Sequence, residues 1–309
     1  MWKSALWRFL TRCYATPWLV LAMTMLMWAG NVVASRLAVG EISPMALTCL
    51  RWVIVCILLT PVTHRNLAAD WNAVRPIWPR LFVLAILGLT GFNALFYAAG
   101  HITSGVNIAI IQGAIPIFVP IGNLVFFGVR ASAMQLGGLV LTLLGIVVVA
   151  THGNPLALRD LQTNLGDLLI LIAGVFYAAY TLDLRERPQT TALGFFTMLA
   201  YAACLTSLPL LAYEILGGTV IWPTPKGLLI LLYVALCPSF LSQVFYLRGI
   251  QLIGPARAGL FINLLPVFGA LLSVLIVGEP FGFYHALALA LVVGGIFVAE
   301  RMGKRRKIA

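Results

Sequence analysis

The chain has 309 residues, of which 61% are hydrophobic and only 9% are charged. This composition is typical of an integral membrane protein. The formal net charge of +11 might suggest a nucleic-acid-binding protein, but the basic residues are scattered between apolar segments and do not form one patch. We therefore expect the lipid bilayer, and no nucleic acid, as a partner.

Ten apolar stretches of roughly 20 residues are each long enough to cross the hydrocarbon core as a helix. In chain order they begin near Trp18, Pro44, Arg80, Ser104, Ser132, Leu165, Thr191, Gly227, Ala256 and Phe281. Ten spans leave room only for short loops. The sequence therefore predicts an all-α integral membrane protein with ten transmembrane helices.

The 20 Lys and Arg residues are divided unequally between the loops. If the amino terminus is cytoplasmic, the outer side receives only Arg36, Arg159 and Lys226, while Arg51 lies inside the second span. Because cytoplasmic loops collect Lys and Arg, this division predicts that both termini face the cytoplasm. The basic tail KRRK, residues 304–307, would then touch anionic lipid.

The two halves of the chain resemble each other. FYAAGH at 96–101 matches FYLRGI at 245–250, and IPIFVP at 115–120 matches LPVFGA at 265–270. The likeness covers three consecutive spans, which favours an internal duplication over chance. Glycine and alanine recur on the fifth and tenth spans and predict close helix packing there, at Gly137, Gly138, Gly145, Ala286, Ala290, Gly294 and Gly295.

Each half contains five predicted spans. Because five is an odd number, the second copy must enter the membrane from the opposite face, so we predict inverted repeats around one site near the bilayer midplane. The chain then divides into a cytoplasmic segment 1–17, a first repeat 18–151, a periplasmic linker 152–164, a second repeat 165–300 and a basic tail 301–309.

Two prolines occupy equivalent positions in the repeats. Pro116 lies near the middle of the fourth span and Pro266 near the middle of the ninth. Each proline removes a backbone hydrogen bond and crowds the preceding turn, so both helices should bend or open there. Paired breaks of this kind indicate a binding site with two hinges, although a kink that serves only packing is the alternative.

Polar and aromatic side chains recur at helical spacing within the spans. Polar groups in lipid face protein or water, so these stripes predict an amphipathic chamber with aromatic walls and amide hydrogen bonds. The alternative is that the same side chains only join neighbouring helices. The candidate substrate-binding residues are Trp28, Asn31, Asn93, Tyr97, Gln112, Phe176, Tyr180, Gln243, Tyr246 and Asn263.

Few ionisable residues lie inside the predicted spans. Arg51 lies about 10 Å into the second span at 1.5 Å per residue, and Glu214 lies near the outer end of the seventh. We hypothesise that the two pair or face one water-filled vestibule, the alternative being two groups that snorkel separately. Asp167 begins the sixth span and is interpreted as a helix cap.

No pattern for metal or cofactor binding is found in the sequence. The five cysteines lack CxxC spacing, and the four histidines lack HExxH spacing. A Walker-type GxxxxGK[ST] motif is also absent. We therefore expect no metal, no cofactor and no enzyme activity, and any energy must come from a gradient.

Two segments resemble a known family. They are WAGNVVASRLAVGEISPMALTCLRW at Trp28 to Trp52 and LLPVFGALLSVLIVGEPF at Leu264 to Phe281. They look like the EamA-type branch of the drug/metabolite transporter superfamily, and the likeness extends from about Trp18 to Ala299. The family's Gly-Glu turn is present in the second half, where Glu279 is interpreted as an outer-loop cap. In the first half Val129 replaces that Glu.

The resemblance implies a bacterial inner-membrane exporter, similar to exporters of aromatic and other amino acids. We therefore expect alternating-access export of a small amphipathic metabolite. The candidate aromatic residues would contact an apolar side chain, while the Asn and Gln residues would hold the polar end. An exporter of drugs or nucleosides is the nearest alternative, and a channel or an intramembrane enzyme is a weaker one. No oligomeric state is predicted.

Overall fold

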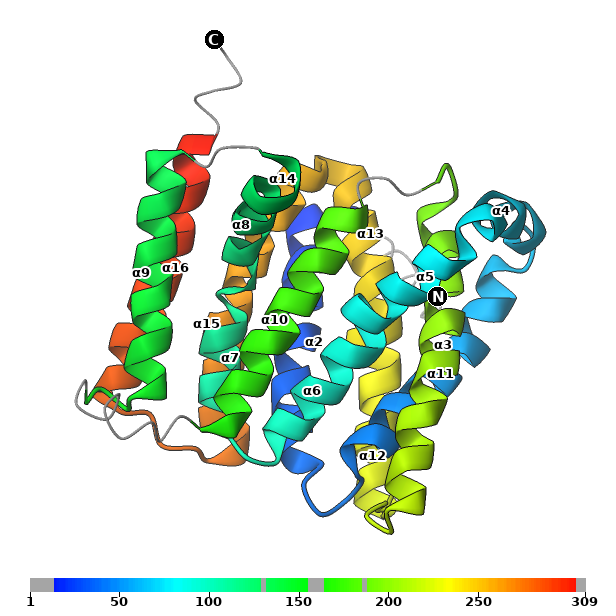
Figure 1. Ribbon diagram of the computed structural model, residues 1–309, viewed down its shortest axis with the longest axis horizontal. Helices are drawn as coiled ribbons and strands as arrows, with labels where there is room; N and C mark the ends of the chain where they lie inside the picture. The colour runs from blue at the N-terminus through cyan, green and yellow to red at the C-terminus, as the bar shows by residue number, and fades with distance from the viewer. Residues whose placement is uncertain (1–13, 129–131, 155–163, 185–187, 304–309) are drawn as a thin grey trace, which may run out of the picture.

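The computed structural model describes residues 14–128, 132–154, 164–184 and 188–303, and no strand occurs among them (Figure 1). The helices of the first half are α2 (Pro17–Leu37), α3 (Pro44–Thr63), α4 (Leu67–Val74), α5 (Trp78–Ala85), α6 (Gly91–Gly100), α7 (Gly105–Gln112), α8 (Ile115–Phe127) and α9 (Ala133–Ala150). Those of the second half are α10 (Leu165–Asp183), α11 (Ala192–Leu216), α12 (Pro225–Val234), α13 (Ser242–Ile253), α14 (Pro255–Gly259), α15 (Leu265–Leu272) and α16 (Phe283–Gly303).

Many of these helices can cross a bilayer. Seven helical stretches are long and apolar enough, and the bent pair α7 and α8 would make an eighth. The apolar parts of α9 and α16, Ala133–Val149 and Phe283–Val298, are shorter. Large apolar side chains on the outer surface, such as Phe126 and Leu229, are exposed as lipid contact requires. An all-helical membrane protein is thus confirmed, while ten crossings and inverted repeats stay predictions.

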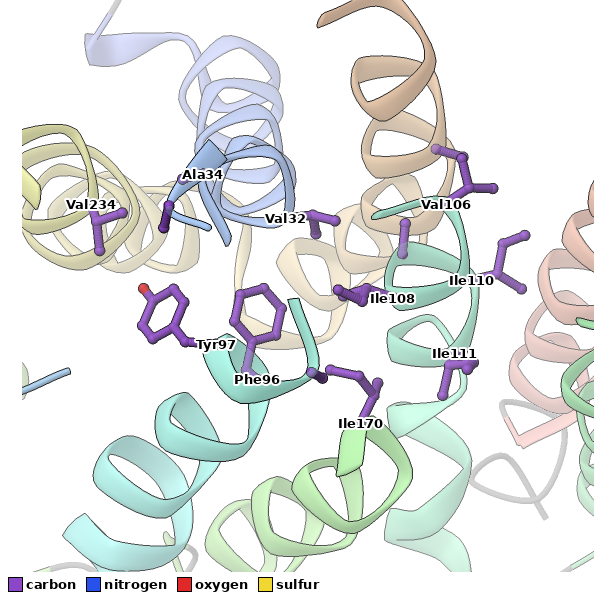
Figure 2. Packing of buried hydrophobic residues seen from close by; sticks show 14 of the residues in the cluster. Val32, Ala34, Phe96, Tyr97, Val106, Ile108, Ile110, Ile111, Ile170 and Val234 are labelled. Atoms are coloured by element: carbon purple, nitrogen blue, oxygen red, sulfur yellow. The ribbon is translucent and has the colours of Figure 1, made fainter. Parts of the chain in front are cut away.

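The main core joins helices from both halves. Figure 2 shows Val32 from α2, Phe96 from α6, Ile108 from α7 and Ile170 from α10 in one apolar cluster. Each of these side chains is at most 2% exposed. The α2, α6, α7 and α10 helices therefore form a close-packed centre, against which the outer helices lie.

The helices α9 and α16 lie side by side at the left edge of Figure 1. A Cβ at Gly145 would lie 2.9 Å from the Ala288 carbonyl oxygen, so this glycine permits close approach. The same holds for Gly295, but a Cβ at Gly137 or Gly294 would meet nothing within 4 Å. The predicted close packing is thus confirmed at Gly145 and Gly295 and wrong at Gly137 and Gly294, which point away from the partner helix.

Both expected proline breaks occur, but in different forms. In the first half, the axes of Gly105–Gln112 and Ile117–Phe127 differ by 41°. In the second half, the 3₁₀ segment η6 (Leu260–Leu264) precedes α15. Pro116 and Pro266 therefore lie in the first turns of α8 and α15, where a helix does not need the missing N–H group.

The two halves share two further local features. A π-helical segment interrupts α5 and α6 at η2 (Ile86–Thr90), and another interrupts α12 and α13 at η5 (Ala235–Leu241). Gly128 and Gly278, which the sequence comparison aligns, both end a helix in the left-handed region, with φ of 64° and 76°. Any residue with a Cβ would be strained at these two C-caps.

Carboxylates join the halves at both ends of the bundle. Asp183 accepts two hydrogen bonds of 2.7 Å from Arg80 at the predicted inner end. At the predicted outer end Glu279 accepts from Arg36 at 2.9 Å and also caps α7, since it accepts from the N–H groups of Gly105 and Val106. Glu279 is therefore a cap, as expected, but of a helix in the other half.

The structure contradicts two expectations about charged residues. Glu214 accepts from the hydroxyl of Ser43 and from the N–H groups of Met45 and Ala46 at the start of α3, where a helix end attracts negative charge. Its predicted pairing with Arg51 is therefore wrong. Asp167 does not cap its own helix. Asn164 does so, while Asp167 accepts from Thr103 in the other half.

A glycine substitution tests the packing of α9 on α16. In Gly295→Ala the new Cβ would lie 2.4 Å from Thr142 Oγ1 and 2.6 Å from the Gly138 carbonyl oxygen. We expect unfolding in detergent to become easier by roughly 1–3 kcal/mol, because the neighbours must shift. Gly294→Ala is the matched control. Equal unfolding midpoints for the two variants would contradict the close packing.

Candidate functional site

A central cavity of about 360 Å³ lies between the two halves. The first half contributes lining residues from α2, α3, η2, α6, α7 and α8, and the second half from α10, α11, η5, η6, α13 and α15. The volume falls in the range of about 300–1,000 Å³ that is usual for small-molecule sites. The wall is mainly apolar and aromatic, with a few polar side chains among them.

Arg51 of α3 is the cation in the cavity wall, and its side chain is only 5% exposed. Its Nε donates to Ser239 Oγ at 2.6 Å, and its Nη1 donates to Asn93 Oδ1 at 2.5 Å and Tyr97 Oη at 2.7 Å. The Tyr97 hydroxyl then donates to Asn31 Oδ1 at 2.9 Å. This network fixes the guanidinium between α3, α6 and η5, and all its acceptors are neutral.

Five of the ten candidate residues line the cavity. Trp28 donates from its indole N–H to the Pro238 carbonyl oxygen at 3.2 Å and to Ser242 Oγ at 2.9 Å, so its ring is fixed against η5 and α13. The side-chain oxygen Oε1 of Gln112 is buried and accepts no hydrogen bond from a described residue. The five lining candidates are Trp28, Asn31, Asn93, Gln112 and Gln243.

The other five candidates lie behind or beside the wall. Tyr97 is fully buried and acts on the cavity through Arg51. Tyr246 packs on Trp28 with ring centroids 5.3 Å apart. Phe176 and Tyr180 of α10 lie against glycines of the first half, and Asn263 lies in η6 next to the lining residue Ile262. Tyr97, Phe176, Tyr180 and Tyr246 thus contact residues of other helices and do not line the cavity.

Several lining residues were missed in the sequence. The sequence predicts that Arg51 pairs with Glu214 or faces a vestibule with it, whereas the structure places Arg51 in the wall of this cavity. The aromatic wall consists mainly of residues that the polar stripes did not include, namely Trp52, Phe92, Tyr177 and Phe196. A lone cation at membrane depth, without an acid at the same depth, was the available signal for this site.

Two of the π-helical segments, η2 and η5, shape the cavity wall. Gly88 and Leu89 of η2 and Pro238 and Ser239 of η5 all line the cavity. A π turn widens a helix and leaves backbone carbonyl groups without their usual partners, and such turns are frequent at functional sites. The Pro238 carbonyl oxygen shows this, since it accepts from Trp28 and from Ser242.

The arrangement suits reversible binding of a small molecule. Within the described ranges, no group of three or more His, Cys, Asp or Glu side chains is placed to hold a metal ion. The lining offers aromatic faces, amide groups and one guanidinium. These groups can enclose an apolar body and hold a polar end by hydrogen bonds.

Comparisons with known proteins match this chain to one transporter family and to several uncharacterized transporters. The profile of the EamA-like transporter family matches residues 16–151 and again residues 164–300. An uncharacterized transporter of Archaeoglobus fulgidus is 25% identical over 91% of this chain and 96% of its own length. The uncharacterized transporter YyaM of Bacillus subtilis is 30% identical over 71% of this chain and 72% of its own.

Two further matches extend along most of the chain. The uncharacterized inner membrane transporter YedA of Escherichia coli is 25% identical over 90% of this chain and 88% of its own length. A solved crystal structure matches with a TM-score of 0.62 and 20% identity, covering 94% of this chain and 98% of that chain. The structural match shows a shared fold.

A tyrosine substitution tests the network around Arg51. Tyr97→Phe removes the hydroxyl that accepts from Arg51 and donates to Asn31. Two buried partners then lose a hydrogen bond, so we expect the free energy of unfolding to fall by about 1–3 kcal/mol. The measurement is denaturant unfolding in detergent. Tyr213→Phe, at a side chain that is 76% exposed, is the control and should leave the midpoint unchanged.

Proposed function

Because the chain belongs to the EamA-like transporter family, we propose that it exports small amphipathic metabolites, above all amino acids including aromatic ones, from the cytoplasm. Its relatives are named as transporters, which indicates a transporter and not an enzyme. With relatives in the inner membrane and several helices able to span it, the protein is a multi-pass protein of the inner membrane.

The observation that supports this proposal best is the cavity between the two halves. Its aromatic side chains suit an apolar or aromatic group, while its amide groups and Arg51 suit the polar end of the same molecule. Trp28, Asn31, Asn93, Gln112 and Gln243 are the proposed contacts. Tyr97, Phe176, Tyr180, Tyr246 and Asn263 support them from behind or beside the wall.

Alternating access is the mechanism that we propose. If the two copies are inverted, a small rearrangement of one against the other opens the cavity to either side in turn. The breaks at Pro116 and Pro266 are proposed hinges. The two breaks lie against each other, since a Cβ built at Gly113 would lie 2.8 Å from the Cβ of Pro266.

The contacts at the two ends of the bundle are proposed to open and close in this cycle. Arg36 and Glu279 join the halves at one end, and Arg80 and Asp183 join them at the other. The Arg80 and Asp183 side chains are 31% and 36% exposed, and exposed pairs of this kind contribute about 0–1 kcal/mol. The Arg80–Asp183 contact can therefore be exchanged without a large energy input.

Counterflow in liposomes tests the proposal. Purified protein is reconstituted with unlabelled phenylalanine inside, and uptake of labelled phenylalanine is measured with and without a proton gradient. We expect saturable counterflow, and uphill accumulation only if transport is coupled to protons. Uptake that neither saturates nor responds to internal substrate would indicate a channel, and counterflow of drugs or nucleosides alone would replace the proposed substrate class.

Cavity variants connect transport to the site. Trp28→Ala and Gln243→Ala should each raise the KM for phenylalanine by about tenfold, since each removes a contact worth roughly 1–2 kcal/mol. Phe126→Ala, at a side chain that is 74% exposed on the outer surface, is the matched control and should not change the KM. Unchanged transport of every tested amino acid in both cavity variants would rule out this binding site.

A further inference from the structure

The Arg51 side chain is a buried cation with an unused donor group. Its Nε and Nη1 atoms donate to Ser239, Asn93 and Tyr97, whereas Nη2 donates to no described residue. The buried polar atoms that lack a hydrogen-bond partner do not include Nη2. An atom without a partner that is not among them has some exposed surface, so Nη2 is accessible. Because Arg51 lines the cavity, this open donor faces the space that a ligand would occupy.

The protein supplies no described carboxylate to this cation. The chain has nine Asp and Glu residues. Those whose side chains the structure describes are engaged at the ends of the bundle, with partners in the other half, and they are Glu41, Asp70, Asp167, Asp183, Glu214 and Glu279. Glu41, for example, lies outside the spans, where the Thr224 hydroxyl lowers its pKa, followed by the Lys226 ammonium.

A buried guanidinium without an anion is unfavourable, because neutral oxygens replace only part of its hydration. The aromatic faces of Trp52 and Tyr97, with centroids 5.0 and 5.9 Å from the guanidinium carbon, compensate part of the remaining charge. The open donor at the cavity therefore indicates that a ligand completes the pair.

We infer that Arg51 binds the carboxylate of the transported molecule, and that the site requires this carboxylate but not an ammonium group. The inference rests on the proposed transport function and narrows its substrate class to amphipathic carboxylates. No carboxylate is found among the described residues that line the cavity, so an ammonium group would meet only neutral acceptors there.

Three molecules with the same ring separate these requirements. Phenylalanine carries both charged groups, 3-phenylpropionate carries only the carboxylate, and 2-phenylethylamine carries only the ammonium. At neutral pH the acid is ionised and the amine is protonated. In liposomes containing the full chain, we compare the concentrations that halve the counterflow of labelled phenylalanine. We expect the concentration for 3-phenylpropionate to lie within about threefold of that for unlabelled phenylalanine. For 2-phenylethylamine this concentration should be at least about tenfold higher, because the amine lacks the carboxylate that accepts charge-assisted hydrogen bonds from Arg51.

Variants of Arg51 assign the preference to this residue. The preference is the ratio of the half-inhibitory concentrations of the amine and the acid. Arg51→Gln should reduce this ratio to about threefold or less. Arg51→Lys should keep part of the preference, because lysine keeps the positive charge. Arg257→Gln, at an exposed arginine of α14, is the matched control and should leave the preference unchanged. The competition in the unaltered protein tests the inference even if Arg51→Gln does not fold.

The outcomes separate the two proposals. If counterflow occurs and the amine competes as well as the acid, or if folded Arg51→Gln keeps the full preference, the inference is overturned while the transport function stands. Counterflow of labelled 3-phenylpropionate without counterflow of phenylalanine would support the inference and remove amino acids from the substrates. If none of the three molecules, phenylalanine, 3-phenylpropionate and 2-phenylethylamine, shows counterflow, the proposed function is wrong and the inference is wrong with it.

Discussion

The structure depends on the requirement that polar groups inside a bilayer find partners within the protein. Arg51 meets this requirement through Asn93 and Tyr97 of α6 in the first half and Ser239 of η5 in the second half. One buried cation therefore ties α3, α6 and η5 together around the cavity. The same bonds orient the guanidinium so that one nitrogen stays open to a ligand, and stability and recognition arise from one set of contacts.

The described carboxylates meet the same requirement in a different way. They lie near the ends of the spans, where water and helix N-termini lower the free energy of a negative charge. Each of them crosses between the halves, as Asp183 does to Arg80 and Glu279 does to Arg36. The described carboxylates thus join the halves at the ends of the bundle, whereas the middle contains apolar packing, the Arg51 network and the cavity.

The cavity itself arises from irregular backbone at corresponding places in the two halves. The segments η2 and η5 are π-helical, and the matched prolines lie just after the breaks, in the first turns of α8 and α15. Irregular backbone at membrane depth is tolerated where it is buried in protein or lines a cavity. Residues of η2, η5 and η6 and of the first turns of α8 and α15 all line the cavity.

The sequence by itself determined the apolar helical character, the likeness of the two halves and the places of the two proline breaks, because these follow from local composition and from comparison of one half with the other. It also gave five of the cavity residues, Trp28 among them. The family came from the resemblance of two segments to known sequences. Only the tertiary structure decided which partners the charged residues have. Glu214 caps α3 and Arg51 binds Tyr97, since both contacts join segments that are distant in the chain. Helical spacing marked Tyr180 as inward but could not tell a cavity from a neighbouring helix.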